Sequence, residues 1–130
     1  MTSTVSLRTH GGATTVAGAD GLAVTIDGRP EVSEQLLGLA VAGCYANTLL
    51  AEAAGRGVQI RDLSVRVEIE WFDTPARTRS VAVHIEIAAD ADEPTVMELV
   101  EHADRVSAVA NAIRLEVPVH VADVRAPQPV

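Results

Sequence analysis

Alternation of apolar and polar residues predicts strands in the first and middle parts of the chain. Residues 4–28 alternate in short runs separated by glycine-containing turns, which predicts three short antiparallel strands. Residues 60–72 place every second side chain on one apolar face, and residues 81–88 repeat this pattern after the turn at Thr74 and Pro75. We therefore expect two long strands of a hairpin, each with one face in the core and one face in solvent.

An almost wholly apolar stretch predicts a long helix between these groups of strands. Pro30 and Ser33 suit a helix start, and Gly55 and Gly57 suit its end, because glycine tolerates the left-handed conformation of a C-terminal cap. The sequence "LLGLAVAGCYANTLL" leaves almost no polar face, so the helix should be buried nearly all round. A small domain seldom surrounds a helix completely. We therefore expect a second copy to cover it in an intertwined homodimer.

The last third of the chain predicts a second helix and a final strand. Thr95 and Glu98 fit a capping box, in which the hydroxyl and the carboxylate satisfy free amides at a helix start. The apolar stripe of this helix extends over residues 95–114. Residues 115–124 alternate again, and Pro118 assigns this strand to the edge or end of a sheet because proline cannot donate to a ladder.

The order of these elements predicts an α+β fold, with antiparallel sheets around two long helices. The chain has 130 residues, which is the usual size of one domain, so residues 1–130 are expected to form a single domain. Aromatic residues make up only 2% of the chain. The core must therefore consist of valine, alanine, leucine and isoleucine.

The charge balance argues against nucleic acids and anionic membranes as partners. The formal net charge is -8, whereas those partners bind clustered lysine and arginine. The N-terminal residues lack the basic and apolar regions of a secretory signal, and the apolar run 36–44 is too short to span a bilayer. A single cysteine cannot form an internal disulfide. We therefore expect a cytoplasmic protein.

Few side chains are candidates for chemistry. The four histidines show no metal-ligand spacing, so neither a metal nor another cofactor is expected. His84 and His120 lie on the polar faces of their strands, which indicates solvated side chains. Cys44 is the only thiol, and a buried free cysteine is more often an inert small hydrophobe than a nucleophile. Ser107 lies beside an apolar stripe, where a serine usually bonds back to the preceding helical turn.

Two segments, "SEQLLGLAVAGCYANTLL" and "EHADRVSAVANAIRLEVPVHV", together with the order of elements, resemble the OsmC/Ohr family of osmotically induced and organic hydroperoxide resistance proteins. The resemblance covers nearly the whole chain and implies an OsmC-like fold. Cys44 matches the peroxidatic cysteine of that family, and Glu34 matches the acidic residue of its active site. The family's second, resolving cysteine corresponds to Ser107, so the chain resembles a diverged member that lacks this thiol.

The resemblance also implies an active-site arginine, which commonly follows a Gly-Gly turn where this chain has Ala13. Arg8 and Arg29 are the candidates for a substitute cation. A cation matters because the thiolate is the nucleophile and burial raises the pKa of a thiol. Ten residues of straight helix separate Glu34 from Cys44 by about 15 Å. The two can serve one site only if Glu34 folds back at the helix entry or comes from the partner subunit.

The implied function is thiol-dependent reduction of organic hydroperoxides, a peroxiredoxin-like antioxidant activity against oxidative stress. Without a second cysteine, Cys44 would act alone and an external thiol would reduce it. Two alternatives remain open. The chain could have lost this chemistry and bind a small apolar ligand in the dimer pocket, or it could use Cys44 in other nucleophilic chemistry such as acyl transfer. An arginine able to reach Cys44, from among Arg8, Arg29 and Arg77, would favour the reductase.

Overall fold

The computed structural model describes residues 6–10, 13–17, 29, 31–73 and 76–127. The chain divides into two compact units, Met1–Glu34 and Gln35–Val130. In the first unit, β1 (Ser6–His10) and β2 (Ala13–Ala17) pair as an antiparallel hairpin. These are two of the three strands predicted there, and the third falls on residues outside the described ranges.

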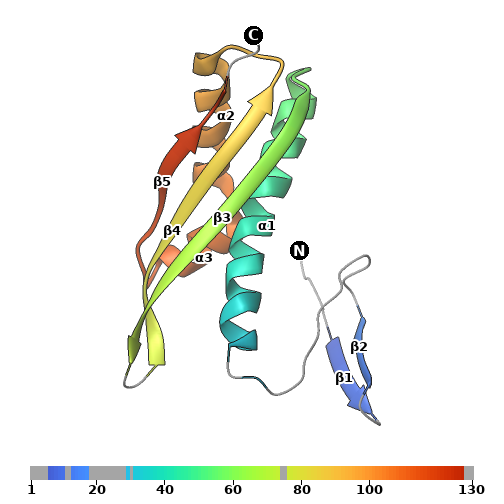
Figure 1. The fold of residues 1–130 in the computed structure, drawn as a ribbon, viewed down its shortest axis with the longest axis vertical. Coiled ribbons are helices and arrows are strands. Elements are labelled where there is room, and N and C mark those ends of the chain that lie inside the picture. The colour runs from blue at the N-terminus through green and yellow to red at the C-terminus, as the bar shows by residue number, and fades with distance from the viewer. Residues whose placement is uncertain (1–5, 11–12, 18–28, 30, 74–75, 128–130) are drawn as a thin grey trace. The chain divides into compact units, whose positions relative to one another are not determined.

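The framework of the second unit is a sheet with the strand order β3-β4-β5 (Figure 1). β3 (Ile60–Asp73) and β4 (Ala76–Ala89) are antiparallel, which confirms the predicted hairpin. β5 (Val119–Arg125) runs parallel to β4 at the edge of the sheet, as the preceding proline indicates. It begins later than predicted because residues 115–118 form the turn that leads out of the preceding helix.

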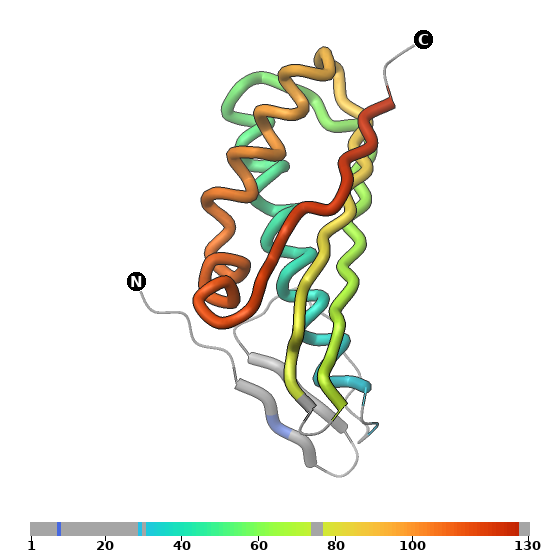
Figure 2. The backbone as a smooth tube through the Cα atoms, turned by 90° about the vertical axis from the view of Figure 1, so that its left-hand side faces the viewer, coloured from blue at the N-terminus to red at the C-terminus, as the bar shows by residue number. Residues whose placement is uncertain are grey.

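The helices α1 (Val32–Gly55), α2 (Glu93–Val106) and α3 (Ala108–Arg114) lie on one side of this sheet (Figure 2). The core fills the space between the two layers. From Val81 to Ala89, every second residue of β4 belongs to this core, and each of these residues is almost completely buried. The largest fully buried members of the core cluster are Val41, Tyr45, Leu49, Val81, Val83, Ile85, Ile87, Val96 and Leu99.

α1 begins and ends where the sequence predicts. Glu34 lies in its first turn, where a negative charge complements the helix dipole. At the other end Gly57 adopts a φ of 69°, a left-handed conformation that costs glycine little. The prediction of burial nearly all round is wrong for the single chain, because only one face of α1 packs on the sheet. The opposite face, which we call the open face of α1, consists of Leu36, Leu39, Ala40, Gly43, Asn47, Leu50, Ala51 and Ala54.

By length and composition α1 could also cross a membrane. Its most apolar 18-residue window has a mean hydropathy of 1.4, and 22% of that window is buried. The core helix of a soluble protein meets the same criterion. The packed face of α1 argues for a protein environment, since Tyr45 on that face forms hydrogen bonds to polar groups of other helices.

The second predicted helix differs from the structure in two ways. It is broken at Ser107, whose extended backbone (φ -67°, ψ 105°) separates α2 from α3. No glycine or proline marks this break, so local sequence could not indicate it. The predicted capping box is also wrong. Asp92 is the N-cap of α2, and its carboxylate accepts the backbone N–H of Thr95 at 3.0 Å.

Candidate functional site

Cys44 lies in the middle of α1, and this free cysteine is a partly exposed residue. Its neighbours on one side, Val41 and Tyr45, are completely buried, whereas Gly43 belongs to the open face. An added Cβ at Gly43 would meet no atom within 4 Å outside its chain neighbours and the adjoining helix backbone. Cys44 therefore lies at the border between the packed core and the open face, where a small molecule or a second protein surface can reach it.

The charged residues predicted for the site lie apart from Cys44 along the chain. Glu34 is exposed in the first turn of α1, and because the helix is continuous it stays about 15 Å of axial rise from Cys44. Arg8 is exposed on β1. Arg29 is exposed and forms an ion pair with Glu31 at 3.9 Å. The approach of either arginine to the thiol stays a prediction.

Ser107 occupies the break between α2 and α3 and is completely buried. Its hydroxyl donates to the carbonyl of Ala103 at 2.6 Å, and its backbone N–H donates to the same oxygen at 3.0 Å. A hydroxyl bonded in this way back to the preceding turn is a structural group. The assignment of Ser107 to the position of a second cysteine stays an expectation from the resemblance.

A polar cluster beside the helical turn of Cys44 was not predicted from the sequence. The Tyr45 hydroxyl donates to Oδ1 of Asp104 at 2.6 Å and accepts from Nη2 of Arg114 at 2.9 Å. Nη2 of Arg114 also pairs with Asp104. We call Tyr45, Asp104 and Arg114 the polar cluster. It joins α1 to α2 and to the end of α3.

Burial raises the pKa of the Tyr45 phenol, and its hydrogen bond to the Asp104 carboxylate raises it further. The phenol is therefore neutral and acts as a hydrogen-bonding group. One signal in the sequence could have revealed it. Tyr45 is the only tyrosine of the chain and stands inside an apolar helix, and a buried tyrosine hydroxyl normally needs a polar partner.

His84 forms a second polar group on the outer face of the sheet. Its Nδ1 is hydrogen-bonded to Asp123, and its Nε2 lies 3.2 Å from Oε1 of Glu68, without hydrogen-bond geometry. Asp123 reaches the ring because β5 carries one extra residue: Val121 pairs with Val83, but Asp123 pairs with His84. His84 is therefore hydrogen-bonded to a carboxylate and only 21% exposed, and its interpretation as a solvated side chain is wrong.

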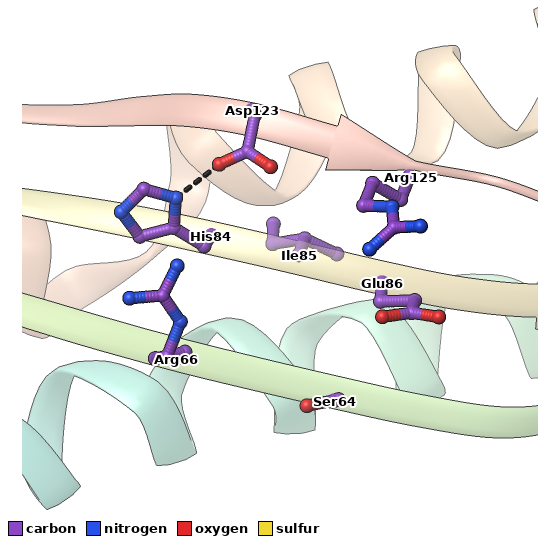
Figure 3. A pocket seen from close by; sticks show the side chains of 7 residues that line it. All are labelled: Ser64, Arg66, His84, Ile85, Glu86, Asp123 and Arg125. Carbon is purple, nitrogen blue, oxygen red and sulfur yellow. Dashed lines mark hydrogen bonds and ion pairs between the residues drawn. The ribbon is translucent and has the colours of Figure 1, made fainter.

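His84 and Asp123 line a pocket of about 170 Å³ that extends across β3, β4 and β5 (Figure 3). The lining residues are Ser64, Arg66, His84, Ile85, Glu86, Asp123 and Arg125. A histidine oriented by a carboxylate can act as a general base when a nucleophile contacts its other nitrogen. Ser64 is the only hydroxyl in the lining, and Figure 3 shows it beyond Arg66, away from the ring. Within the described part of the chain, no group of His, Cys, Asp and Glu residues could hold a metal.

Several solved structures have folds similar to that of this chain. The chain is similar to an OsmC-like protein from Mycoplasma pneumoniae, with a TM-score of 0.74, 16% identity and coverage of 100% of this chain and 99% of the other. It is similar to the organic hydroperoxide resistance protein OsmC of Legionella pneumophila, with a TM-score of 0.60, 22% identity and coverage of 100% and 98%. For the organic hydroperoxide resistance protein OhrB of Bacillus subtilis the TM-score is 0.58, with 21% identity and 98% coverage of both chains.

At these identities the likenesses establish an OsmC-like α+β fold. A search of curated proteins found no match to this chain. A family model described as "OsmC-like protein" matches residues 32–122, which include α1, the sheet strands β3 and β4, and both later helices. Because this match covers more than half of the 130 residues, the chain belongs to the OsmC family.

Proposed function

We propose that this protein is a one-cysteine reductase of organic hydroperoxides, with Cys44 as its nucleophile and an external thiol as its reductant. The observation that carries the proposal is the position of the chain's single thiol in an OsmC-family fold. Cys44 is partly exposed, in the middle of α1, and at the border of an apolar face. An apolar border suits a substrate with a hydrocarbon group. The similar proteins named for organic hydroperoxide resistance support the same reading.

In the proposed reaction, the Cys44 thiolate attacks the terminal oxygen of the hydroperoxide. The S–O bond forms as the O–O bond breaks, so the sulfur is oxidised to a sulfenic acid and the alkoxide leaves and takes up a proton as the alcohol. The first external thiol then forms a mixed disulfide with Cys44 and releases water. A second thiol attacks this disulfide and regenerates the Cys44 thiol, and the reductant leaves as its own disulfide.

The thiolate requires stabilisation, for which Arg8 and Arg29 are the proposed cations and Glu34 their proposed partner. We further propose that the open face of α1 binds a second copy of the chain in a homodimer. Leu39 and Leu50 are 48% and 49% exposed on this face, and monomeric proteins rarely expose a continuous apolar face of this kind. A dimer would allow Glu34 to serve the partner's site, since the continuous helix keeps it about 15 Å of axial rise from Cys44 of its own chain. The proposed location is the cytoplasm.

The test combines two measurements on the full chain. The rate of Cys44 alkylation by iodoacetamide is followed as a function of pH, and the intact mass is recorded after one equivalent of cumene hydroperoxide. We expect an alkylation midpoint well below the ordinary thiol pKa of about 8.5, and rapid gain of one oxygen atom that Cys44→Ser abolishes. Turnover with dithiothreitol should then produce cumyl alcohol catalytically.

Single substitutions of the arginines test which of them stabilises the Cys44 thiolate. Arg8→Gln and Arg29→Gln are compared with Arg61→Gln, which removes an exposed arginine paired with Asp90 on the sheet. Slower oxidation in one of the first two variants, and an unchanged rate in the third, would identify the substitute cation. A wild-type thiol that reacts slowly, with a midpoint near the ordinary value, would contradict the reductase. That result would favour the binding of an apolar ligand or acyl transfer by Cys44.

A further inference from the structure

The polar cluster connects four elements of the fold at one point. Beyond its bonds to Tyr45 and Asp104 side chains, Arg114 donates through Nη1 to the backbone carbonyl of Asp104 at 2.8 Å. Its Nε donates to the carbonyl of Val119, the first residue of β5, at 3.1 Å. One guanidinium thus holds α1, α2, α3 and β5 together. The planar arrangement of its donors makes arginine suited to such multiple contacts.

The cluster includes the residue next to the proposed nucleophile and two residues on either side of the break at Ser107. Tyr45 follows Cys44 directly in α1. Asp104 and Arg114 flank Ser107 in the two helices that meet at the break. The hydrogen bonds of Tyr45 therefore hold the helical turn of Cys44 against the helices that carry Ser107.

The cluster also places one positive and one negative charge near this turn. Tyr45 is completely buried, and the side chains of Asp104 and Arg114 are 37% and 26% exposed. Charges in such partly buried positions interact more strongly with their neighbours than they would in water. The Tyr45 phenol is neutral and adds no charge to the cluster. The negative charge of Asp104 and the positive charge of Arg114 therefore offset each other, and removal of either residue leaves the other charge unbalanced.

We propose that Tyr45, Asp104 and Arg114 are positioning residues of the Cys44 site, which fix the thiol-bearing turn of α1 and set the balance of charge around it. The hydrogen bonds supply the rigidity, and the Asp104–Arg114 pair supplies the charge balance. This inference rests on the proposed reactivity of Cys44. It adds residues that contact neither the hydroperoxide nor the sulfur.

The experiment measures the pH dependence of Cys44 alkylation by iodoacetamide in folded variants, together with their thermal unfolding. Asp104→Asn keeps the shape and an acceptor oxygen but leaves Arg114 positive, so the alkylation midpoint should fall by about half a pH unit. Arg114→Gln leaves Asp104 negative, so the midpoint should rise by a similar amount. Tyr45→Phe changes no charge, so its midpoint should stay while the alkylation rate changes several-fold.

Two further variants separate charge from structure. Arg114→Lys keeps the charge but not the planar donors, so its midpoint should stay at the wild-type value although its unfolding temperature falls. Glu52→Gln is the matched control. It removes a carboxylate of α1 that accepts a hydrogen bond from Arg56 at 3.0 Å and lies 3.2 Å from His102 of α2, and it should leave the midpoint unchanged.

Opposite shifts for Asp104→Asn and Arg114→Gln would support the inference, because loss of stability alone would not move them in opposite directions. Identical midpoints in all variants, with only lower unfolding temperatures, would overturn it and leave the cluster as a structural tie. An equal shift in Glu52→Gln would also overturn it. Alkylation needs no hydroperoxide, so failure of peroxide reduction would be detected separately and would leave this measurement valid.

Discussion

At the residue scale, the environment of a side chain decides its role more than its identity does. Cys44, inside the apolar helix α1, is partly exposed, whereas Ser107, at the break between α2 and α3, is completely buried and bonded to Ala103. Tyr45 is the single tyrosine and becomes the centre of a polar cluster because Asp104 and Arg114 fold against it. Each of these differences depends on neighbours that are distant in sequence.

The neutral Tyr45 phenol should make the protein sensitive to alkali. Its folded pKa is raised, so its contribution to stability is complete below the ordinary phenol pKa of about 10 and is lost as the pH rises further. The chain has ten arginines and no lysine, so no lysine titrates in this range. In a Cys44→Ser background, we expect the absorbance of tyrosinate to increase only together with loss of helix, as followed by circular dichroism.

Tyr45→Phe provides the comparison. At neutral pH it should lower the free energy of unfolding by about 1 kcal/mol, because it removes a buried hydrogen-bonding hydroxyl while Asp104 and Arg114 remain paired. Above about pH 10, the free energy of unfolding should decrease much less in Tyr45→Phe than in the protein that keeps Tyr45. Equal alkaline loss in both proteins, measured by denaturant unfolding, would show that another group controls it.

At the element scale, helix ends and breaks depend on which polar group is in place to satisfy them. Asp92, two residues before Pro94, caps α2 in place of the predicted Thr95 and Glu98. The break at Ser107 allows Arg114 to return towards Asp104. The extra residue in β5 brings Asp123 opposite His84. Periodicity predicts the existence of an element better than its boundaries, because boundaries follow from such single contacts.

Capping by Asp92 should depend on pH. The hydrogen bonds from Thr95 lower the pKa of the exposed Asp92 carboxyl below its ordinary value of 3.8. A depressed folded pKa gives a stabilisation that is present above 3.8 and is lost as the pH falls through the folded pKa. Wild-type protein should therefore lose unfolding temperature on acidification relative to Asp92→Asn, which keeps a neutral acceptor.

Thermal unfolding at neutral pH and near pH of about 3 measures this effect, with Asp92→Ala as the variant that removes the cap altogether. The unfolding temperature of wild type should exceed that of Asp92→Ala by less at the acidic pH than at neutral pH. The difference in unfolding temperature between Asp92→Asn and Asp92→Ala should stay the same. An equal difference in unfolding temperature between wild type and Asp92→Ala at both pH values would mean that the charge of Asp92 does not stabilise α2.

At the scale of the whole molecule, the open face of α1 is the feature that a single chain does not explain. The packed side of the helix is fully used, with Val41, Tyr45 and Leu49 completely buried. Between Leu36 and Ala54 the other side is almost wholly apolar, with Asn47 as its one polar side chain. Burial of this face against a second copy would satisfy the apolar sequence of the helix and would place Cys44 at the edge of the interface.

Two matched substitutions test this arrangement. Ala40→Arg introduces a charge on the open face, whereas Ala112→Arg introduces the same charge on the exposed surface of α3. Wild type and Ala112→Arg should sediment as dimers in analytical ultracentrifugation, and Ala40→Arg should sediment as a monomer or aggregate, because an unpaired charge in an apolar interface is costly. A monomeric wild type, or dimers in all three proteins, would contradict the use of this face.

Local sequence was enough to predict the two long strands, the extent of α1, the edge position of β5 and the α+β order, because each follows from periodicity, glycine or proline. The segments around Cys44 and Ser107 also indicated the family. Tertiary contacts account for the exposure of Cys44, the break at Ser107 and the polar cluster around Tyr45. These depend on contacts between residues far apart in the chain, such as Tyr45 and Arg114, which no periodic pattern of one segment can encode.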